Sequence, residues 1–195
     1  MSTIDTITAR IRALQVELED EIAKRGEAFR YRLKNGRIEF EDEVRRQHRL
    51  ARVQLWDFLR RTRPMVVVTA PVIYALIVPF ALLDFFVWFF QMVCFPVYGI
   101  PKVSRRDHIR IDRHKLAYLN ALQKMNCVYC GYCNGVISYV REAAGRTEAY
   151  WCPIKHASPV KDPHGEYAAF VDFGDAQGFV DGGEDLRVKF KNDAE

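Results

Sequence analysis

The sequence MVVVTAPVIYALIVPFALLDFFVWFFQMVCFPVYGI, residues 65–100, is the strongest structural signal in this chain. Its 36 residues contain one charged side chain, Asp84. A run of about 18 apolar residues is already long enough to predict a membrane helix. The run starts too far into the chain, and is too long, for a secretory signal peptide. We therefore predict that it is embedded in lipid, with a buried helix pair inside a globular domain as the alternative.

The length of this run raises the question of how it meets the bilayer. One helix of this length would extend for about 54 Å, whereas the hydrocarbon core is about 30 Å thick. Pro79 and Asp84 lie near its middle, and proline kinks a helix because it lacks a backbone donor. We expect a break between these two residues and a helical hairpin, either two short spans or a re-entrant wedge, with Asp84 at its tip. One tilted span with kinks is the alternative.

Basic residues flank the run on both sides, namely Arg60, Arg61 and Arg63 before it and Lys102, Arg105, Arg106, Arg110, Arg113 and Lys115 after it. Basic residues near the ends of membrane segments stay on the cytoplasmic side. Both flanks are thus predicted to be cytoplasmic, at the inner membrane if the source is bacterial, and this favours the hairpin. Arginine near a membrane surface also attracts anionic lipid headgroups.

Residues 1–63 have the pattern of a charged helical arm. Isoleucine and leucine alternate spacings of three and four, at Ile4, Ile7, Ile11, Leu14 and Leu18, which is the pattern of a coiled coil. A turn at Asn35-Gly36 and a second helix from Glu39 to Thr62 would complete a helical hairpin. The stripe predicts self-association through residues 1–33 or binding to a membrane protein, and packing of the arm on itself is the alternative. Nucleic-acid binding is not expected, because the arginines are mixed with acids.

The segment NCVYCGYCNG, residues 126–135, holds three of the five cysteines, and Cys152-Pro153 follows 19 residues after the third. Four thiolates can hold tetrahedral zinc or an iron–sulfur cluster. Gly131 and Asn134-Gly135 are expected to interrupt any helix through the motif. A following helix, VISYVREAAGRTEAY, would then bridge the two groups so that the four thiolates meet.

The motif CVYCGYC resembles the C-x-x-C-G-x-C core of bacterial-type ferredoxins and of ferredoxin-like subunits of membrane respiratory complexes. This resemblance covers seven residues and the Cys-Pro dipeptide, and it implies one [4Fe–4S] cluster held by Cys127, Cys130, Cys133 and Cys152. The second ferredoxin motif is missing, so a two-cluster fold is not implied. The same residues resemble the knuckles of rubredoxins and zinc ribbons. That resemblance implies zinc or a single iron on Cys127, Cys130, Cys152 and either Cys133 or His156. Unused thiols, a disulfide and a redox pair remain alternatives.

The end of the chain differs in composition from the rest. Residues 158–195 contain 4 Lys and Arg against 9 Asp and Glu, whereas the chain as a whole is basic, with a net charge of +4. We expect an acidic, Gly- and Pro-rich arm with short strands and no EF-hand calcium loop. The predicted organisation is mainly α, in four parts: the arm at 1–63, the membrane segment at 64–100, a basic helix with the cysteine region at 101–157, and the tail at 158–195.

Together these features favour a membrane-anchored, cytoplasm-facing iron–sulfur protein with an accessory or electron-transfer role. The alternative is a membrane scaffold or assembly protein with a structural zinc site and a partner-binding coiled-coil arm. The sequence has no nucleophile–base arrangement, phosphate loop or nucleotide motif, so an enzyme is less favoured.

Overall fold

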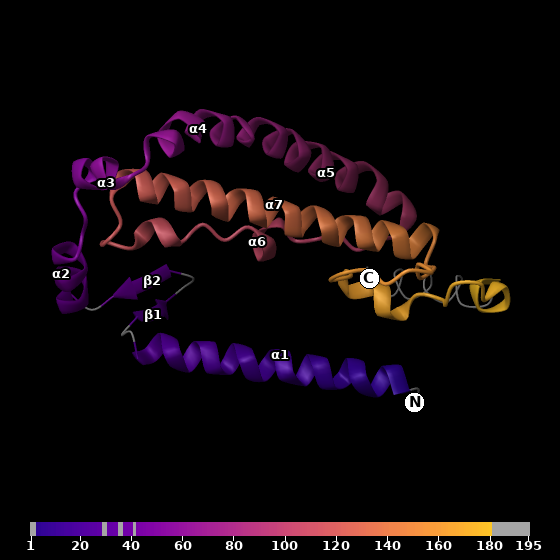
Figure 1. The fold of residues 1–195 in the computed structure, drawn as a ribbon. Coiled ribbons are helices and arrows are strands. Elements are labelled where there is room, and N and C mark those ends of the chain that lie inside the picture. Colours follow the sequence, from indigo (N-terminus) through magenta and orange to yellow (C-terminus); the bar gives the residue numbers. More distant parts are fainter. Residues whose placement is uncertain (1–2, 29–30, 35–36, 41, 181–195) are drawn as a thin grey trace. The chain divides into compact units, whose positions relative to one another are not determined.

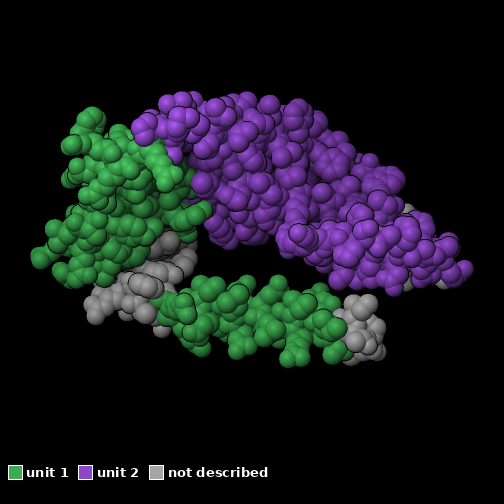
Figure 2. Space-filling view, viewed as in Figure 1, with its two compact units in different colours: residues 1–63, 112–128 green, residues 64–111, 129–195 purple. Residues whose placement is uncertain are grey.

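The computed structural model describes residues 3–28, 31–34, 37–40 and 42–180, and it is mainly helical, as predicted (Figure 1). Its elements are, in order, α1 (Thr3–Ala28), β1 (Tyr31–Lys34), β2 (Arg37–Phe40), α2 (Asp42–Leu50), α3 (Leu55–Arg61), α4 (Pro64–Ala75), α5 (Ile77–Tyr98), α6 (Arg105–His108), η1 (Arg113–Lys115), α7 (Ala121–Trp151) and η2 (Gly165–Ala169). The chain divides into two compact units, residues 1–63 with 112–128 and residues 64–111 with 129–195 (Figure 2).

The first unit confirms the first helix of the arm but not the second. After α1, strands β1 and β2 pair antiparallel, with Tyr31 opposite Phe40 and Lys34 opposite Arg37. The predicted helix from Glu39 to Thr62 is wrong, because β2 ends at Phe40 and the remainder forms the separate helices α2 and α3. Each strand alternates apolar and charged residues with a period of two, which favours a strand over a helix. The predicted turn lies outside the described residues.

The apolar run forms a bent helix in place of the predicted hairpin. Helices α4 and α5 follow each other with a break at Leu76, and α5 continues through both Pro79 and Asp84. The break lies three residues before Pro79, its expected cause, because a proline ring clashes with the carbonyl group of residue i−4, here Ala75, the last residue of α4. At the far end, Gly99 adopts a left-handed conformation with φ 67° and its N–H group bonds to the Phe95 carbonyl, which ends the helix.

Helix α7 lies beside α5 and runs in the same direction, since Tyr132 contacts Asp84 and Tyr139 contacts Gln91. After α5, residues 99–111 run back along the two helices, and we call them the returning segment. The core of the second unit comes from all three segments and consists of Phe95, Ile100, Val103, Tyr139 and Ala143.

Helix α7 is continuous, so the prediction that glycine and asparagine residues interrupt it is wrong. A Cβ atom at Gly135 would lie 2.7 Å from the Ile109 Cα atom, so a larger residue there would collide with the returning chain. Glycine costs about 1 kcal/mol in a helix. Here it allows the returning segment to pack directly on the backbone of α7.

The end of the described chain packs on the last turns of α7. Ala149 and Phe170 are buried together, and Ile154 and Val171 form an isolated parallel bridge. The short strands predicted for the tail are therefore limited, within the described residues, to this single bridge. Residues 181–195 lie outside the description.

Candidate lipid-facing site and the predicted metal ligands

In the described part of the chain, one helical run, Pro64–Tyr98, is long and apolar enough to cross a membrane, judged by length and composition alone. Large apolar side chains cover much of its surface. Those exposed by between 47% and 77% include Val68, Val72, Phe86, Phe89 and Val97. An uninterrupted apolar surface of this kind is unusual on a soluble monomer and marks an interaction with lipid or protein.

The face of α5 that packs on α7 carries the two polar residues Asp84 and Gln91 beside apolar ones such as Phe95. Asp84, which the sequence placed at a wet hairpin tip, is only 7% exposed. Arg105 donates to it through Nη2 at 2.6 Å and through Nε at 2.9 Å, and the Tyr132 hydroxyl group donates to it at 2.9 Å. The hydrogen bonds with Asp84 raise the pKa of Arg105, because they favour the charged guanidinium group. The carboxylate of the apolar run is therefore neutralised by the returning chain.

Gln91 makes a second polar link on the same face. Its Nε2 atom donates to the Tyr139 hydroxyl group at 2.6 Å, and its Oε1 atom accepts from the Val103 backbone N–H group at 2.7 Å. All three residues are buried. The sequence contained a signal for this face, because Asp84 and Gln91 are seven residues apart in an apolar run and so share one side of a helix.

The returning segment also carries exposed charges. Asp107 and Arg110 form an ion pair of 3.8 Å, and their side chains are 70% and 72% exposed. Arg105, only two residues before Asp107, is fixed to Asp84 near the middle of the run Pro64–Tyr98. The two residues between Asp107 and Arg110, His108 and Ile109, lie against Ser138 and Gly135 of α7, so the exposed ion pair lies beside the second half of the apolar run and not at one of its ends.

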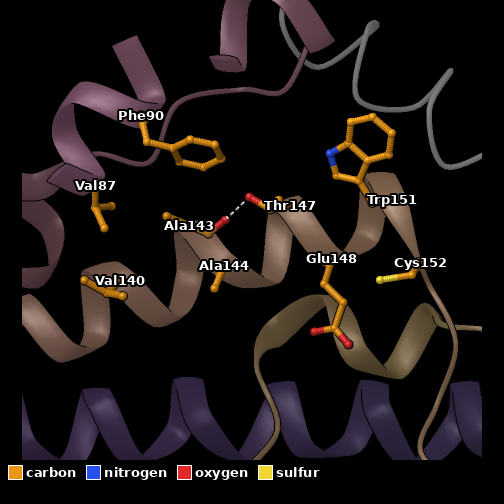
Figure 3. A pocket seen from close by; sticks show the side chains of 9 residues that line it. All are labelled: Val87, Phe90, Val140, Ala143, Ala144, Thr147, Glu148, Trp151 and Cys152. Carbon is orange, nitrogen blue, oxygen red and sulfur yellow. Dashed lines mark hydrogen bonds between the residues drawn. The ribbon is translucent and has the colours of Figure 1, made fainter. Parts of the chain in front are cut away.

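An apolar cavity of about 400 Å³ lies between α5 and the C-terminal half of α7 (Figure 3). The residues that line it are Val87, Phe90, Val140, Ala143, Ala144, Thr147, Glu148, Trp151 and Cys152. Its few polar groups are largely satisfied, since Glu148 Oε2 lies 3.1 Å from His164 Nε2 and the Thr147 hydroxyl group donates to the Ala143 carbonyl at 2.8 Å. The cavity therefore offers mainly apolar contacts.

The structure does not bring the predicted metal ligands together. Cys127, Cys130 and Cys133 lie on α7, and Cys152 follows its last residue. The 19 residues from Cys133 to Cys152 are almost wholly helical, which separates them by about 28 Å. Ligands of one zinc ion each lie within about 2.3 Å of it. The four-cysteine set predicted for an iron–sulfur cluster or for zinc therefore does not fit a single site.

The alternative ligand His156 also lies beyond the end of α7, where its Nδ1 atom is 3.3 Å from the Tyr167 hydroxyl group. Within the described ranges, no group of three or more His, Cys, Asp and Glu residues could hold a metal ion. All five cysteines are free, and the three on α7 differ in environment. Cys130 is exposed and Cys133 is buried, and burial raises the pKa of the Cys133 thiol.

Comparisons with models of protein families, with curated proteins and with solved structures find no match to this chain. A functional proposal therefore depends on the geometry of the apolar run and the groups packed against it.

Proposed function

We propose that this chain is a membrane-anchored accessory protein of the scaffold or assembly type, in which α4 and α5 lie along the surface of the bilayer within one leaflet. The observation that carries this proposal is the exposed ion pair of Asp107 and Arg110 beside the second half of the apolar run, away from both of its ends. The apolar face of α4 and α5 points into the lipid, and the returning segment remains in water.

The cost of burying charges favours this orientation over a crossing. A crossing centred near Asp84 would carry Arg106, Asp107 and Arg110 toward the hydrocarbon, at about 2.5–3.5 kcal/mol for each charged residue at the bilayer centre. The run is also longer than needed, since 35 residues extend about 52 Å, against about 30 Å of hydrocarbon. An interfacial helix instead buries its apolar face about 5–10 Å deep and leaves its polar side in water. Both basic flanks would then lie on the same side.

The arm gives the anchored protein a means of binding a partner. The apolar stripe of α1 is uncovered, and Ile7, Ile11, Leu14 and Leu18 are between 51% and 60% exposed. Apolar residues at spacings of three and four bind the matching stripe of another helix. We infer that α1 recruits a partner helix, from a second copy or from a membrane protein, to the membrane surface.

Electron transfer through a bound cluster is not part of this proposal, because α7 keeps Cys133 and Cys152 apart. Metal analysis of protein purified without oxygen tests this separation. Replacing Cys152 by serine should leave the content of iron and zinc unchanged. Loss of a stoichiometric metal on this substitution would show that the four cysteines do form one site.

Flotation with lipid vesicles tests the membrane anchor. The wild-type chain should float with phosphatidylcholine vesicles and resist alkaline extraction. A variant with Phe86→Glu and Phe89→Glu should be released, because both side chains are on the exposed apolar surface. Ile137→Glu is the matched control, since Ile137 is an exposed apolar residue on α7, one turn before the exposed Arg141. Equal release of the two variants would contradict the assignment of α4 and α5 as the lipid face.

A further inference from the structure

A second cavity, of about 480 Å³, combines apolar and basic groups. Helix α5 contributes Trp88 and Met92, which are half-exposed members of the apolar surface. The returning segment contributes residues 102–106, including Lys102 and Arg106, whose side chains are exposed. The cavity therefore lies at the boundary between the proposed lipid face and the water-exposed chain.

The positive charge of this cavity is not cancelled by the acids near it. Arg105 is held by Asp84 at 2.6 Å, and Asp107 pairs with Arg110 on the same segment. Among the described residues, neither Lys102 nor Arg106 forms an ion pair with these acids or with any other. As far as the described residues go, the two cations are thus available to bind an anion.

We propose that this cavity binds the head group of an anionic phospholipid, with the phosphate at Lys102 and Arg106 and the first part of an acyl chain along Trp88 and Met92. The proposal deepens the membrane anchoring proposed above and rests on it. Arginine and lysine are the residues that bind phosphate groups in proteins. Tryptophan is enriched at the level of lipid headgroups, because its ring is apolar and its N–H group is polar.

The lining argues for a lipid over a soluble phosphate. A soluble phosphate would use the two cations and leave the side chains of Trp88 and Met92 without a role. A phospholipid uses both parts of the lining. Its phosphate contacts the two cations, and the hydrocarbon chain attached to that phosphate contacts the apolar side chains. Beyond the cavity, the acyl chain of the lipid would continue along the exposed surface of the apolar run.

Fluorescence of Trp88 can measure this binding in the full-length protein. The other two tryptophans are removed by Trp56→Phe and Trp151→Phe, and the protein is held in micelles of a neutral detergent. It is titrated with short-chain phosphatidylglycerol, short-chain phosphatidylcholine or inorganic phosphate. We expect phosphatidylglycerol to bind most tightly. Lys102→Gln with Arg106→Gln should weaken it on the order of thirtyfold, from two lost charge contacts.

Arg110→Gln is the matched control, because Arg110 is an exposed cation on the same segment that does not line the cavity. It should leave the affinity unchanged, and far-UV circular dichroism should show every variant folded. An equal loss of phosphatidylglycerol affinity with Arg110→Gln would show that binding depends only on general surface charge, and it would overturn the proposal. Equal binding of phosphatidylcholine, or of inorganic phosphate, would also overturn it. The titration is done in micelles without a bilayer. It therefore tests the headgroup site even if the flotation experiment contradicts the membrane anchor.

Discussion

Replacing Gln91 by leucine should weaken the packing of α5 on α7 by removing a fully buried amide. The substitution leaves the Val103 N–H group and the Tyr139 hydroxyl group without the partners that now lie at 2.7 Å and 2.6 Å. Each unsatisfied buried group costs about 1–3 kcal/mol, and the pair about 2–6 kcal/mol. Leucine offsets about 1–2 kcal/mol of this through better burial of an apolar side chain. The middle of these two ranges gives a net loss of about 2–3 kcal/mol in the free energy of unfolding.

Chemical unfolding in detergent micelles, followed by helical circular dichroism, would measure this loss. The matched control is Gln54→Leu, which changes an exposed glutamine before α3 and should alter stability by less than about 0.5 kcal/mol. Combining Gln91→Leu with Tyr139→Phe should cost less than the sum of the single changes, because both remove the same hydrogen bond. A loss for Gln91→Leu no greater than that of the control would refute the polar link between α5, α7 and the returning chain.

Two further predictions concern α7. Gly135→Ala should destabilise the protein by about 1–3 kcal/mol in the same unfolding assay, since its Cβ atom would lie 2.7 Å from the Ile109 Cα atom. Gly165→Ala, with nothing within 4 Å of the added carbon, should be nearly neutral, and equal effects would contradict the close approach. Maleimide should modify Cys130 well before Cys133 at pH 8, because burial raises the pKa of the Cys133 thiol and keeps it protonated. Equal rates, measured by peptide mass spectrometry, would show that α7 does not bury Cys133.

The apolar run and α1 could be predicted because their signals are local. The apolar run has one charge in 36 residues, and α1 has apolar residues at spacings of three and four. Both patterns can be recognised without knowing which distant residues are in contact. The mainly helical class followed from the same signals. The break in the run was misplaced, however, because the effect of Pro79 falls on Ala75 and not on Pro79 itself.

The environment of Asp84 and the continuity of α7 depend on distant partners. Arg105 lies 21 residues after Asp84, and nothing local in the sequence indicates that they pair. From the local sequence alone, Gly135 predicts a break in the helix. In the structure it lies within a continuous helix, and its lack of a side chain allows Ile109 to pack against the backbone. The cysteine spacing fits a metal motif only if the chain turns within it. The straight helix through Cys133 removes that possibility in this structure.

Site-directed labelling of single cysteines tests the membrane orientation most directly. The native cysteines are replaced, and Thr62, Ser104 and Asp107 are changed to cysteine one at a time. A membrane-impermeant maleimide is then applied to intact cells and to permeabilised cells. With the cytoplasmic side expected from the basic flanks, the proposed orientation predicts that all three positions are protected in intact cells and modified after permeabilisation. Modification of either Thr62→Cys or Ser104→Cys in intact cells, with the other protected, would show that the run crosses the membrane.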